Sequence, residues 1–256
     1  MTPLLQCDDI CISAGGKALA SKLRWRVAAG ECWGLLGPNG CGKTTLLLSL
    51  AGLSPLQRGR ILLKQRHINS YSRREFARLV GLLFQHNSYD FPTTVAELVM
   101  TGRFAHQRLL AGASDAECRL VRQRLQQLGI AHLAGRQANS LSGGEMQRVA
   151  MAILLTQAPS LALLDEPENH LDPGVTIKLL QLVKDFFSSN DKALVMALHD
   201  PSIALRLCTH LLLLFGDGRY LAGATATLAT AENLSALYAH PMGVVETDEG
   251  PLFYPR

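Results

Sequence analysis

Short apolar runs alternate with segments of helical spacing along most of this chain. Five runs, at residues 32–36, 79–84, 161–164, 193–198 and 210–215, are as long as strands and contain no Asp, Glu, Lys or Arg. Such runs are typical of strands inside a sheet, and the run at 79–84 is predicted to be buried throughout. Because strands separated by helices form a largely parallel sheet with helices on its faces, the pattern predicts an α/β fold.

Helices are predicted between these strands. The spacing of apolar residues indicates helices at 43–52, at 144–156 and at 201–208, and another that begins near Pro173. Proline suits the first turn of a helix, where its missing N–H removes no hydrogen bond. These helices supply the layers that a parallel sheet needs on its faces.

Two regions depart from this alternation. Short strands at 4–12, 22–28 and 59–64 predict N-terminal antiparallel β strands. Residues 94–138 have helical spacing and few strand signals, so we predict a helical subdomain, at roughly residues 94–158, inserted into the core.

Composition narrows the class of protein. The chain has 256 residues, of which 48% are hydrophobic and 18% charged, so a packed core is expected. The net charge of +4 is spread along the sequence and is too small to indicate a nucleic-acid partner. No linker is long enough to separate domains, so residues 1–256 are predicted to form a single domain.

Compartment signals are also informative. No apolar run approaches the roughly 18 residues of a membrane-spanning helix. Residues 1–9 lack the basic and apolar regions of a signal peptide, so a cytosolic location is expected. The cysteines have no C-x-x-C spacing, and most are expected to be buried and reduced. They are Cys7, Cys11, Cys32, Cys41, Cys118 and Cys208.

The most specific motif is Gly37–Thr44, which fits G-x-x-x-x-G-K-[ST] between a predicted strand and a predicted helix. In this context backbone N–H groups and the helix N-terminus bind phosphate, Lys43 reaches the β- and γ-phosphates, and the Thr44 hydroxyl binds Mg²⁺. A nucleoside triphosphate site is therefore expected. Its predicted residues are Gly37, Pro38, Asn39, Gly40, Cys41, Gly42, Lys43, Thr44 and Thr45.

Two adjacent acids, Asp165 and Glu166, follow the apolar run at 161–164. They are expected at the carboxyl edge of the sheet, where α/β proteins bind ligands. Asp165 can belong to the Mg²⁺ shell, and Glu166 can polarise an attacking water. The alternative is an exposed Asp-Glu turn, which the phosphate loop upstream makes less favourable.

A third motif, Leu141–Arg148, reads Leu-Ser-Gly-Gly-Glu-Met-Gln-Arg. Its Ser-Gly-Gly segment can present N–H groups and a hydroxyl to an anion. The alternative on physical grounds alone is a helix cap, because Ser142 and Glu145 have the spacing of a capping box.

These motifs, with His199 after the run at 193–198, resemble in order and spacing the ATP-binding subunit of ABC transporters. The resemblance implies a P-loop NTPase core and ATP hydrolysis with Mg²⁺. It assigns Gln85 to the Q-loop, Glu166 as catalytic base, His199 as the contact to the γ-phosphate and Asp172 to the D-loop. Where many relatives have Ser-Ala-Leu-Asp, residues 169–172 are Asn-His-Leu-Asp.

In this family the signature of one subunit completes the ATP site of another, so the resemblance implies a homodimer. The signature residues are Leu141, Ser142, Gly143, Gly144 and Glu145, and the implied Mg²⁺ ligands are Thr44, Gln85 and Asp165.

A narrower resemblance is to the bacterial importer ATPases for iron-siderophores, haem and cobalamin. It rests on His86–Pro92, Val99–Arg103 and Leu234–Pro241. It implies a transmembrane permease that docks near Gln85–Pro92, indirect cooperation with a periplasmic or lipoprotein substrate-binding protein, no nucleic acid, and a peripheral position on the cytoplasmic face of the bacterial inner membrane.

Three other interpretations remain open. The first is the ATPase of another ABC importer, for example for a metal ion. The second is a ribosome-associated ABC protein, suggested by the sequence at 169–172, although such proteins have two cassettes and this chain has one phosphate loop and one signature. The third is a DNA-repair or chromosome ATPase, although those have inserted coiled coils or zinc modules.

Two local features of the nucleotide site are unusual. An aromatic residue that stacks on adenine is expected near Ala14, yet residues 1–24 contain none. Trp25 or a neighbouring aliphatic surface replaces it, or adenine is held loosely. Weak discrimination between bases is expected because stacking is worth about 1–3 kcal/mol. Cys41 lies inside the phosphate loop, where positive dipoles and Lys43 favour a reactive thiolate; the alternative is a small residue that only packs.

Overall fold

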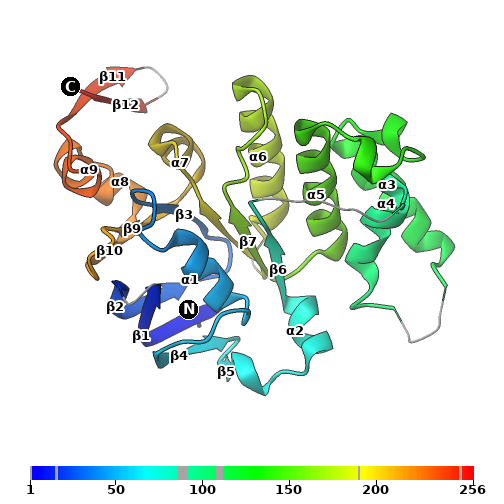
Figure 1. Cartoon of the computed structure of the whole chain (residues 1–256), viewed down its shortest axis with the longest axis horizontal. Helices are drawn as coiled ribbons and strands as arrows, with labels where there is room; N and C mark the ends of the chain where they lie inside the picture. Colours follow the sequence, from blue (N-terminus) through cyan, green and yellow to red (C-terminus); the bar gives the residue numbers. More distant parts are fainter. Residues whose placement is uncertain (1, 15–16, 86–91, 108–111, 190, 248–249) are drawn as a thin grey trace.

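The centre of the molecule is a six-stranded sheet in the order β10-β9-β3-β8-β7-β6 (Figure 1). Five neighbouring strands are parallel, and β10 pairs antiparallel with β9 at one edge. The bounds are β3 (Cys32–Leu36), β6 (Val80–Leu83), β7 (Leu161–Asp165), β8 (Ala193–Ala197), β9 (His210–Leu214) and β10 (Tyr220–Ala224). The computed structural model describes residues 2–14, 17–85, 92–107, 112–189, 191–247 and 250–256.

Two smaller sheets are antiparallel. The N-terminal sheet has the order β2-β1-β4-β5, and the C-terminal hairpin pairs β11 with β12. The predicted N-terminal antiparallel strands are thus confirmed. The bounds are β1 (Leu5–Ala14), β2 (Lys17–Val27), β4 (Arg58–Leu63), β5 (Arg66–His67), β11 (Met242–Thr247) and β12 (Gly250–Pro255).

Helices lie between and beside the sheets. In Figure 1 the inserted helices α3, α4 and α5 gather at one end of the molecule and the β11–β12 hairpin lies at the other. The helices are α1 (Lys43–Leu50), α2 (Arg73–Leu79), α3 (Val95–Met100), α4 (Asp115–Gln127), α5 (Gly143–Gln157), α6 (Pro173–Phe187), α7 (Pro201–Leu207), α8 (Thr225–Leu228) and α9 (Ala231–Tyr238). Short 3-10 turns are η1 (Ile68–Ser70), η2 (Thr101–Arg103), η3 (Ala131–Leu133) and η4 (Ala138–Ser140).

The central sheet separates two apolar clusters. Along β8, Val195 and Ala197 belong to the cluster with α1 and the N-terminal sheet, whereas Leu194 and Met196 belong to the cluster with α5, α6 and the inserted helices. Because side chains alternate between the two faces of a strand, each central strand contributes to both clusters. The predicted α/β class with an inserted helical segment is therefore confirmed, and the inserted helices share a core with the sheet.

Some predicted boundaries were wrong. The strand predicted at 22–28 begins at Lys17, where pairing with β1 holds a segment whose small residues give no apolar pattern. The helix predicted at 43–52 ends at Leu50, shortly before Gly52 with its positive φ of 67°. The run at 79–84 is not buried throughout, because β6 is an edge strand and Phe84, beyond its end, is 46% exposed.

The C-terminal end of α5 is tied to the edge of the sheet. Gln157 Nε2 donates to the carbonyl oxygens of Ala77 and Val80, at 2.8 and 3.0 Å, where α2 passes into β6. A Cβ at Gly81 would lie 2.7 Å from Gln157 Oε1, so a glycine is needed under this side chain. The helix that begins at the signature motif is thus fixed at its other end to the strand that leads to Gln85.

Candidate functional site

The phosphate loop leaves the middle of the sheet. It follows β3, which lies between β8 and β9, and ends at the N-terminus of α1. Gly42 is in the left-handed region with φ 104°, and a Cβ there would lie 2.8 Å from Cβ of Leu19. Only glycine meets both demands, so the loop closes tightly onto the helix N-terminus, where anions bind.

Lys43 lies along this loop. Its side chain is 6% exposed, and its Nζ donates to the carbonyl oxygens of Gly37 at 2.7 Å and Pro38 at 3.4 Å. The ammonium is therefore held beside the loop. The adjoining cavity, of about 180 Å³, is lined by Leu19, Asn39, Gly40, Cys41, Gly42, Lys43, Thr44, Thr45 and Glu166.

The expectation that Trp25 stacks on adenine is wrong. Trp25 is 2% exposed and packs edge-on against Trp33 with ring centroids 5.3 Å apart, so its ring belongs to the core. The aliphatic alternative has a residue to supply it, because Leu19 lines the phosphate-loop cavity. Weak discrimination between bases stays a prediction.

Cys41 packs on the inner side of the loop. It is 2% exposed, and a Cβ at Gly37 would lie 2.6 Å from its Sγ. Burial therefore limits access of a reagent to this thiol and opposes the reactivity that the loop dipoles favour. Modification of Cys41 stays a prediction.

Asp165 ends β7 next to the phosphate loop. It is 4% exposed and forms a hydrogen bond with the Thr44 side chain, while its Oδ1 has no partner among the described residues. Burial raises the pKa of Asp165, and the hydrogen bond with Thr44 opposes this shift. A buried carboxylate oxygen without a partner, beside a hydroxyl, is a donor set that suits Mg²⁺.

Glu166 is the centre of a polar cluster. Its Oε2 accepts from Gln85 Nε2 at 2.5 Å and from Asn169 Nδ2 at 2.9 Å, and its Oε1 lies 2.5 Å from His199 Nε2. Three segments far apart in sequence thus meet at one carboxylate. Glu166 has a φ of 48°, an unusual conformation for a residue other than glycine and one that often marks a functional site.

Glu168 lies next to this cluster. Its Oε1 accepts from the backbone N–H of His199 at 2.7 Å, and its Oε2 is buried without a partner among the described residues. Burial raises the pKa of Glu168, and the hydrogen bond from His199 opposes this shift. The sequence analysis missed the contacts of Glu168 and Asn169, for which the sequence holds no clear signal.

The signature motif forms the start of α5. The capping box is present: Ser142 Oγ accepts from the N–H of Glu145 at 3.3 Å, and Glu145 accepts from the N–H of Ser142 at 2.8 Å. This backbone hydrogen bond lowers the pKa of Glu145. A Cβ at Gly144 would lie 2.9 Å from the carbonyl oxygen of His170, so the glycine lets the D-loop pack against the helix.

A separate cavity, of about 590 Å³, lies at the signature. The predicted residues Ser142 and Asp172 both line it, and among the described residues it shares none with the phosphate-loop cavity. Within one chain the structure therefore brings together the phosphate loop, Asp165, Glu166, Gln85 and His199, and leaves the signature apart. The described residues that line the signature cavity are Ile130, His132, Leu133, Ser142, Gly143, Gly144, Glu145, Arg148, His170, Leu171, Asp172 and Val175.

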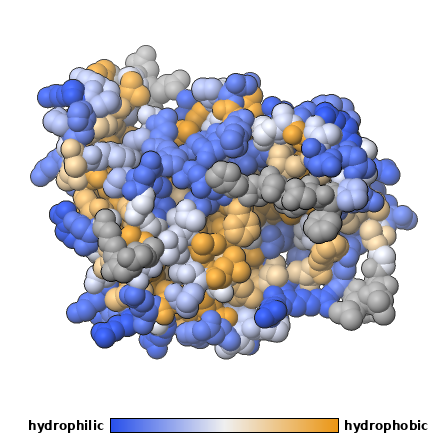
Figure 2. All heavy atoms as spheres, in the orientation of Figure 1, coloured by the Kyte–Doolittle hydropathy of each residue, from blue (hydrophilic) through white to orange (hydrophobic). Residues whose placement is uncertain are grey.

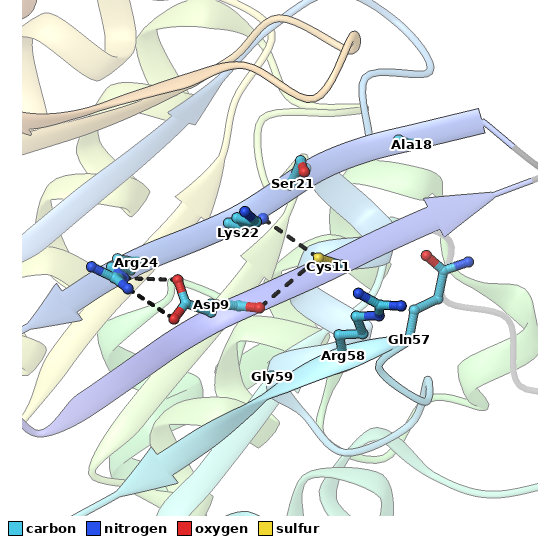
Figure 3. Close-up of a pocket in the computed structure, with 10 residues that line it drawn as sticks. Asp9, Cys11, Ala18, Ser21, Lys22, Arg24, Gln57, Arg58 and Gly59 are labelled. Atoms are coloured by element: carbon cyan, nitrogen blue, oxygen red, sulfur yellow. Dashed lines mark hydrogen bonds and ion pairs between the residues drawn. The ribbon is translucent and has the colours of Figure 1, made fainter.

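A larger cavity, of about 860 Å³, lies on the N-terminal sheet, and its lining shares no residue with the phosphate-loop cavity (Figure 3). Arg24 at its edge is paired with Asp9 through two hydrogen bonds of 2.7 and 2.9 Å, and the N–H of Lys22 points to Cys11 Sγ (Figure 3). It holds no phosphate-loop residue. The docking segment predicted at 85–92 lies outside the described residues except for Gln85 and Pro92.

A phosphate loop, an acidic strand end and a separate helix-capping signature on one chain are the elements of a nucleotide-hydrolysing cassette. The family model described as "ABC transporter" matches residues 20–169, so this chain belongs to the ABC transporter family, as an ATP-binding subunit. Subunits of this kind are ATPases coupled to transport.

Proteins with similar sequences and structures support this family assignment. The chain is 35% identical to the ferric enterobactin transport ATP-binding protein FepC of Escherichia coli K12, over 91% of this chain and 86% of that protein. It is 35% identical to the hemin import ATP-binding protein HmuV of Bradyrhizobium diazoefficiens, over 100% of this chain and 96% of that protein. A solved metal-chelate type ABC transporter in an inward-facing conformation matches with 28% identity and a TM-score of 0.84, covering 100% of this chain and 98% of the solved one. In the part of the chain that the structure describes, no helix is long and apolar enough to cross a membrane.

Proposed function

We propose that this subunit hydrolyses ATP to drive import of an iron-siderophore, haem or cobalamin type substrate, at the cytoplasmic face of a bacterial inner membrane. The observation that carries the ATPase chemistry is Glu166, held beside the phosphate loop by Gln85 and His199. The substrate class rests on relatives whose names specify ferric enterobactin, hemin and cobalamin.

Each residue then has a role in hydrolysis. The loop N–H groups and Lys43 bind the phosphates, Glu166 orients and polarises the attacking water, and His199 contacts the γ-phosphate. Mg²⁺, held by Thr44, Asp165 and Gln85, would neutralise charge on the β- and γ-phosphates. The unpartnered oxygen of Asp165 supports this ligand set.

The active unit is a homodimer in this proposal. The signature cavity and the phosphate-loop cavity are separate in one chain, so a second copy is needed to bring a signature to each phosphate loop. The cycle of closing on ATP and opening after hydrolysis would be transmitted to a permease, and a periplasmic or lipoprotein binding protein would deliver the substrate to that permease.

The permease is proposed to dock beside Gln85, near residues 85–92. Large apolar side chains are exposed at Leu53 (62%), Phe84 (46%) and Phe104 (65%), and Phe84 directly precedes Gln85 in the chain. We propose that these three side chains belong to the docking surface. Figure 2 shows apolar surface in the middle of one face of the molecule. Exposed apolar side chains of this size favour a protein partner, because burying each of them away from water lowers the free energy.

The replacement Glu166→Gln tests the proposed chemistry. We expect ATP turnover to fall by a factor of about 100 or more, with ATP binding retained and a closed dimer that persists, because the amide fills the same space but cannot act as a base. Single-turnover hydrolysis measures the fall in turnover, and size-exclusion chromatography with ATP detects the ATP-bound closed dimer. Turnover at the parent rate would refute the role of Glu166.

Pull-down from detergent-solubilised native membranes tests the transport role. A polytopic permease among the retained proteins, identified by mass spectrometry, is the expected result. Retention of ribosomal or DNA-processing proteins without a membrane protein would leave the ATPase chemistry intact and reject the transport role.

A further inference from the structure

We infer that two adjacent side chains, Glu168 and Asn169, are positioning residues for the catalytic pair, Glu166 and His199. This inference rests on the proposed roles of that pair. Asn169 Nδ2 donates to Glu166 Oε2 at 2.9 Å, and Glu168 Oε1 accepts from the backbone N–H of His199 at 2.7 Å. One two-residue segment thus contacts both members of the pair.

The contact of Asn169 with Glu166 is local. The N–H of Asn169 donates to the carbonyl oxygen of Glu166 at 3.2 Å, and this turn brings the amide back onto the carboxylate. Gln85, the other amide donor to Oε2, belongs to a distant segment that adjoins the proposed permease contact. If Gln85 served as a Mg²⁺ ligand, Asn169 would still orient the carboxylate, whose Oε1 contacts His199.

The backbone of Glu166 makes such support necessary. A φ of 48° is disfavoured for a residue with a Cβ, and such conformations persist only where neighbouring contacts hold them. The N–H of Glu166 donates to the carbonyl oxygen of Ala197 at 3.0 Å, which fixes its backbone to the end of β8. The Asn169 amide fixes the side chain, so both parts of Glu166 are held.

Glu168 has the corresponding role for His199. This histidine follows β8, and its imidazole is 40% exposed, so core packing does not set the position of its ring. The hydrogen bond from its N–H to Glu168 fixes the start of the loop that carries the ring. Glu168 is largely desolvated, with one oxygen left without a partner among the described residues, an arrangement that core packing alone would disfavour.

Matched substitutions in the full-length protein test each contact. Asn169→Asp keeps the shape but removes the donor, whereas Asn169→Ser keeps a shorter donor. Glu168→Gln keeps an acceptor for the His199 N–H, whereas Glu168→Leu removes it. Asn69→Asp makes the same chemical change as the first variant at an exposed position outside the site.

We expect Asn169→Asp and Glu168→Leu to lower kcat for ATP by about tenfold, with KM and ATP binding within about twofold of the parent. Glu168→Gln and Asn69→Asp should stay close to the parent, and Asn169→Ser should recover part of the loss. This separation of kcat from KM distinguishes positioning from general damage, which thermal unfolding and fluorescent-ATP binding report independently.

Three results would overturn the inference: parent kcat in Asn169→Asp, increased kcat in that variant, or equal kcat in Glu168→Gln and Glu168→Leu. Glu166→Gln, measured in parallel, distinguishes failure of the positioning role from failure of the proposed catalytic role. If Glu166→Gln retains turnover, the proposed function of the site fails. If it loses turnover while the positioning variants do not, only the positioning role of Glu168 and Asn169 fails.

Discussion

At the scale of single residues, Asp165 Oδ1 and the Tyr238 hydroxyl are both buried without a partner among the described residues, but their surroundings differ. Asp165 Oδ1 lies next to Thr44 at the phosphate loop, where a cation would satisfy it. The hydroxyl of Tyr238 is buried at the end of α9. Burial raises the pKa of Tyr238 to about 12, with Cys41 and Asp200 adding to the shift.

The substitution Tyr238→Phe is expected to stabilise the fold by about 1 kcal/mol, because it removes a desolvated hydroxyl that has no hydrogen bond. The advantage should grow above pH 10. There the unfolded tyrosine ionises while the folded one, with its pKa near 12, does not, so the parent loses stability as pH rises through this window.

Thermal unfolding at pH 7 and pH 10.5 measures this difference, and a rise in Tm of about 2–4 °C is expected at neutral pH. Leu237→Ala, a cavity-forming change at the neighbouring buried position, should lower Tm and serves as the control. A lower Tm for Tyr238→Phe would show that the hydroxyl has a partner.

The residues of the site differ in how far sequence predicts them. Lys43, Asp165 and Glu166 lie at or after the carboxyl ends of buried strands, and the carboxyl ends of parallel strands in one sheet share an edge, so the placement of these residues on that edge follows from the apolar pattern. The contacts of Glu168 and Asn169 depend on a turn after Pro167 whose geometry no residue pattern specifies. The burial of Trp25 depends on how the N-terminal sheet packs on the central sheet, where Trp25 contacts Trp33. The sequence near Ala14 holds no information on this packing.

At the scale of elements, capping boxes define four helix starts. Ser72, Thr94, Ser114 and Ser142 each accept from a backbone N–H three residues on, and the glutamate there returns a hydrogen bond. The same chemistry thus begins helices with no contact to nucleotide. The capping role of Ser142, the alternative left open by the sequence, is present, and it is compatible with a second role toward a partner.

The pair Ser142→Ala and Ser114→Ala separates these roles. Each should cost about 1 kcal/mol of stability, because each removes one cap. Only Ser142→Ala should also lower ATP turnover, since Ser142 faces the signature cavity and Ser114 begins a helix outside it. Chemical denaturation and ATPase assays measure the two effects, and equal turnover in both variants would leave Ser142 with a capping role alone.

The elements that were not predicted, apart from α2, have weak or non-local signals. The capping pattern Ser72-x-x-Glu75 marks α2 and was available in the sequence. The strand β10 has mostly exposed or half-buried side chains and is set by pairing with β9, and β11 and β12 pair only with each other. Such strands carry no buried apolar run, so tertiary pairing determines them.

At the scale of the whole molecule, most of the exposed large apolar residues fall into two groups, and Leu221 on β10 lies outside both. Leu53, Phe84 and Phe104 form the group assigned to the proposed permease contact. The other group lies on the C-terminal hairpin, for example Val245 at 48%, paired with Leu252. The proposed function assigns a partner only to the first group.

Phe104→Asp should therefore weaken retention of the permease by at least tenfold in pull-down while the basal ATPase rate stays within about twofold of the parent, because a charge at an apolar contact must be desolvated. Val245→Asp makes a comparable change at an exposed apolar position on the hairpin and should not reduce retention. Equal losses in both variants would contradict the proposed docking position.

The attachment of α5 has a mechanical consequence. The side chain of its last residue, Gln157, donates hydrogen bonds to the carbonyl oxygens of Ala77 and Val80 at the start of β6, and the first turn of α5 belongs to the signature. A helix of 15 residues with a rise of about 1.5 Å per residue is a stiff rod roughly 22 Å long. A tilt of about 10° around Gln157 would carry Ser142 through roughly 4 Å, more than the length of a hydrogen bond. A small rotation of α5 about Gln157 would therefore be enough to make or break a hydrogen bond at the signature.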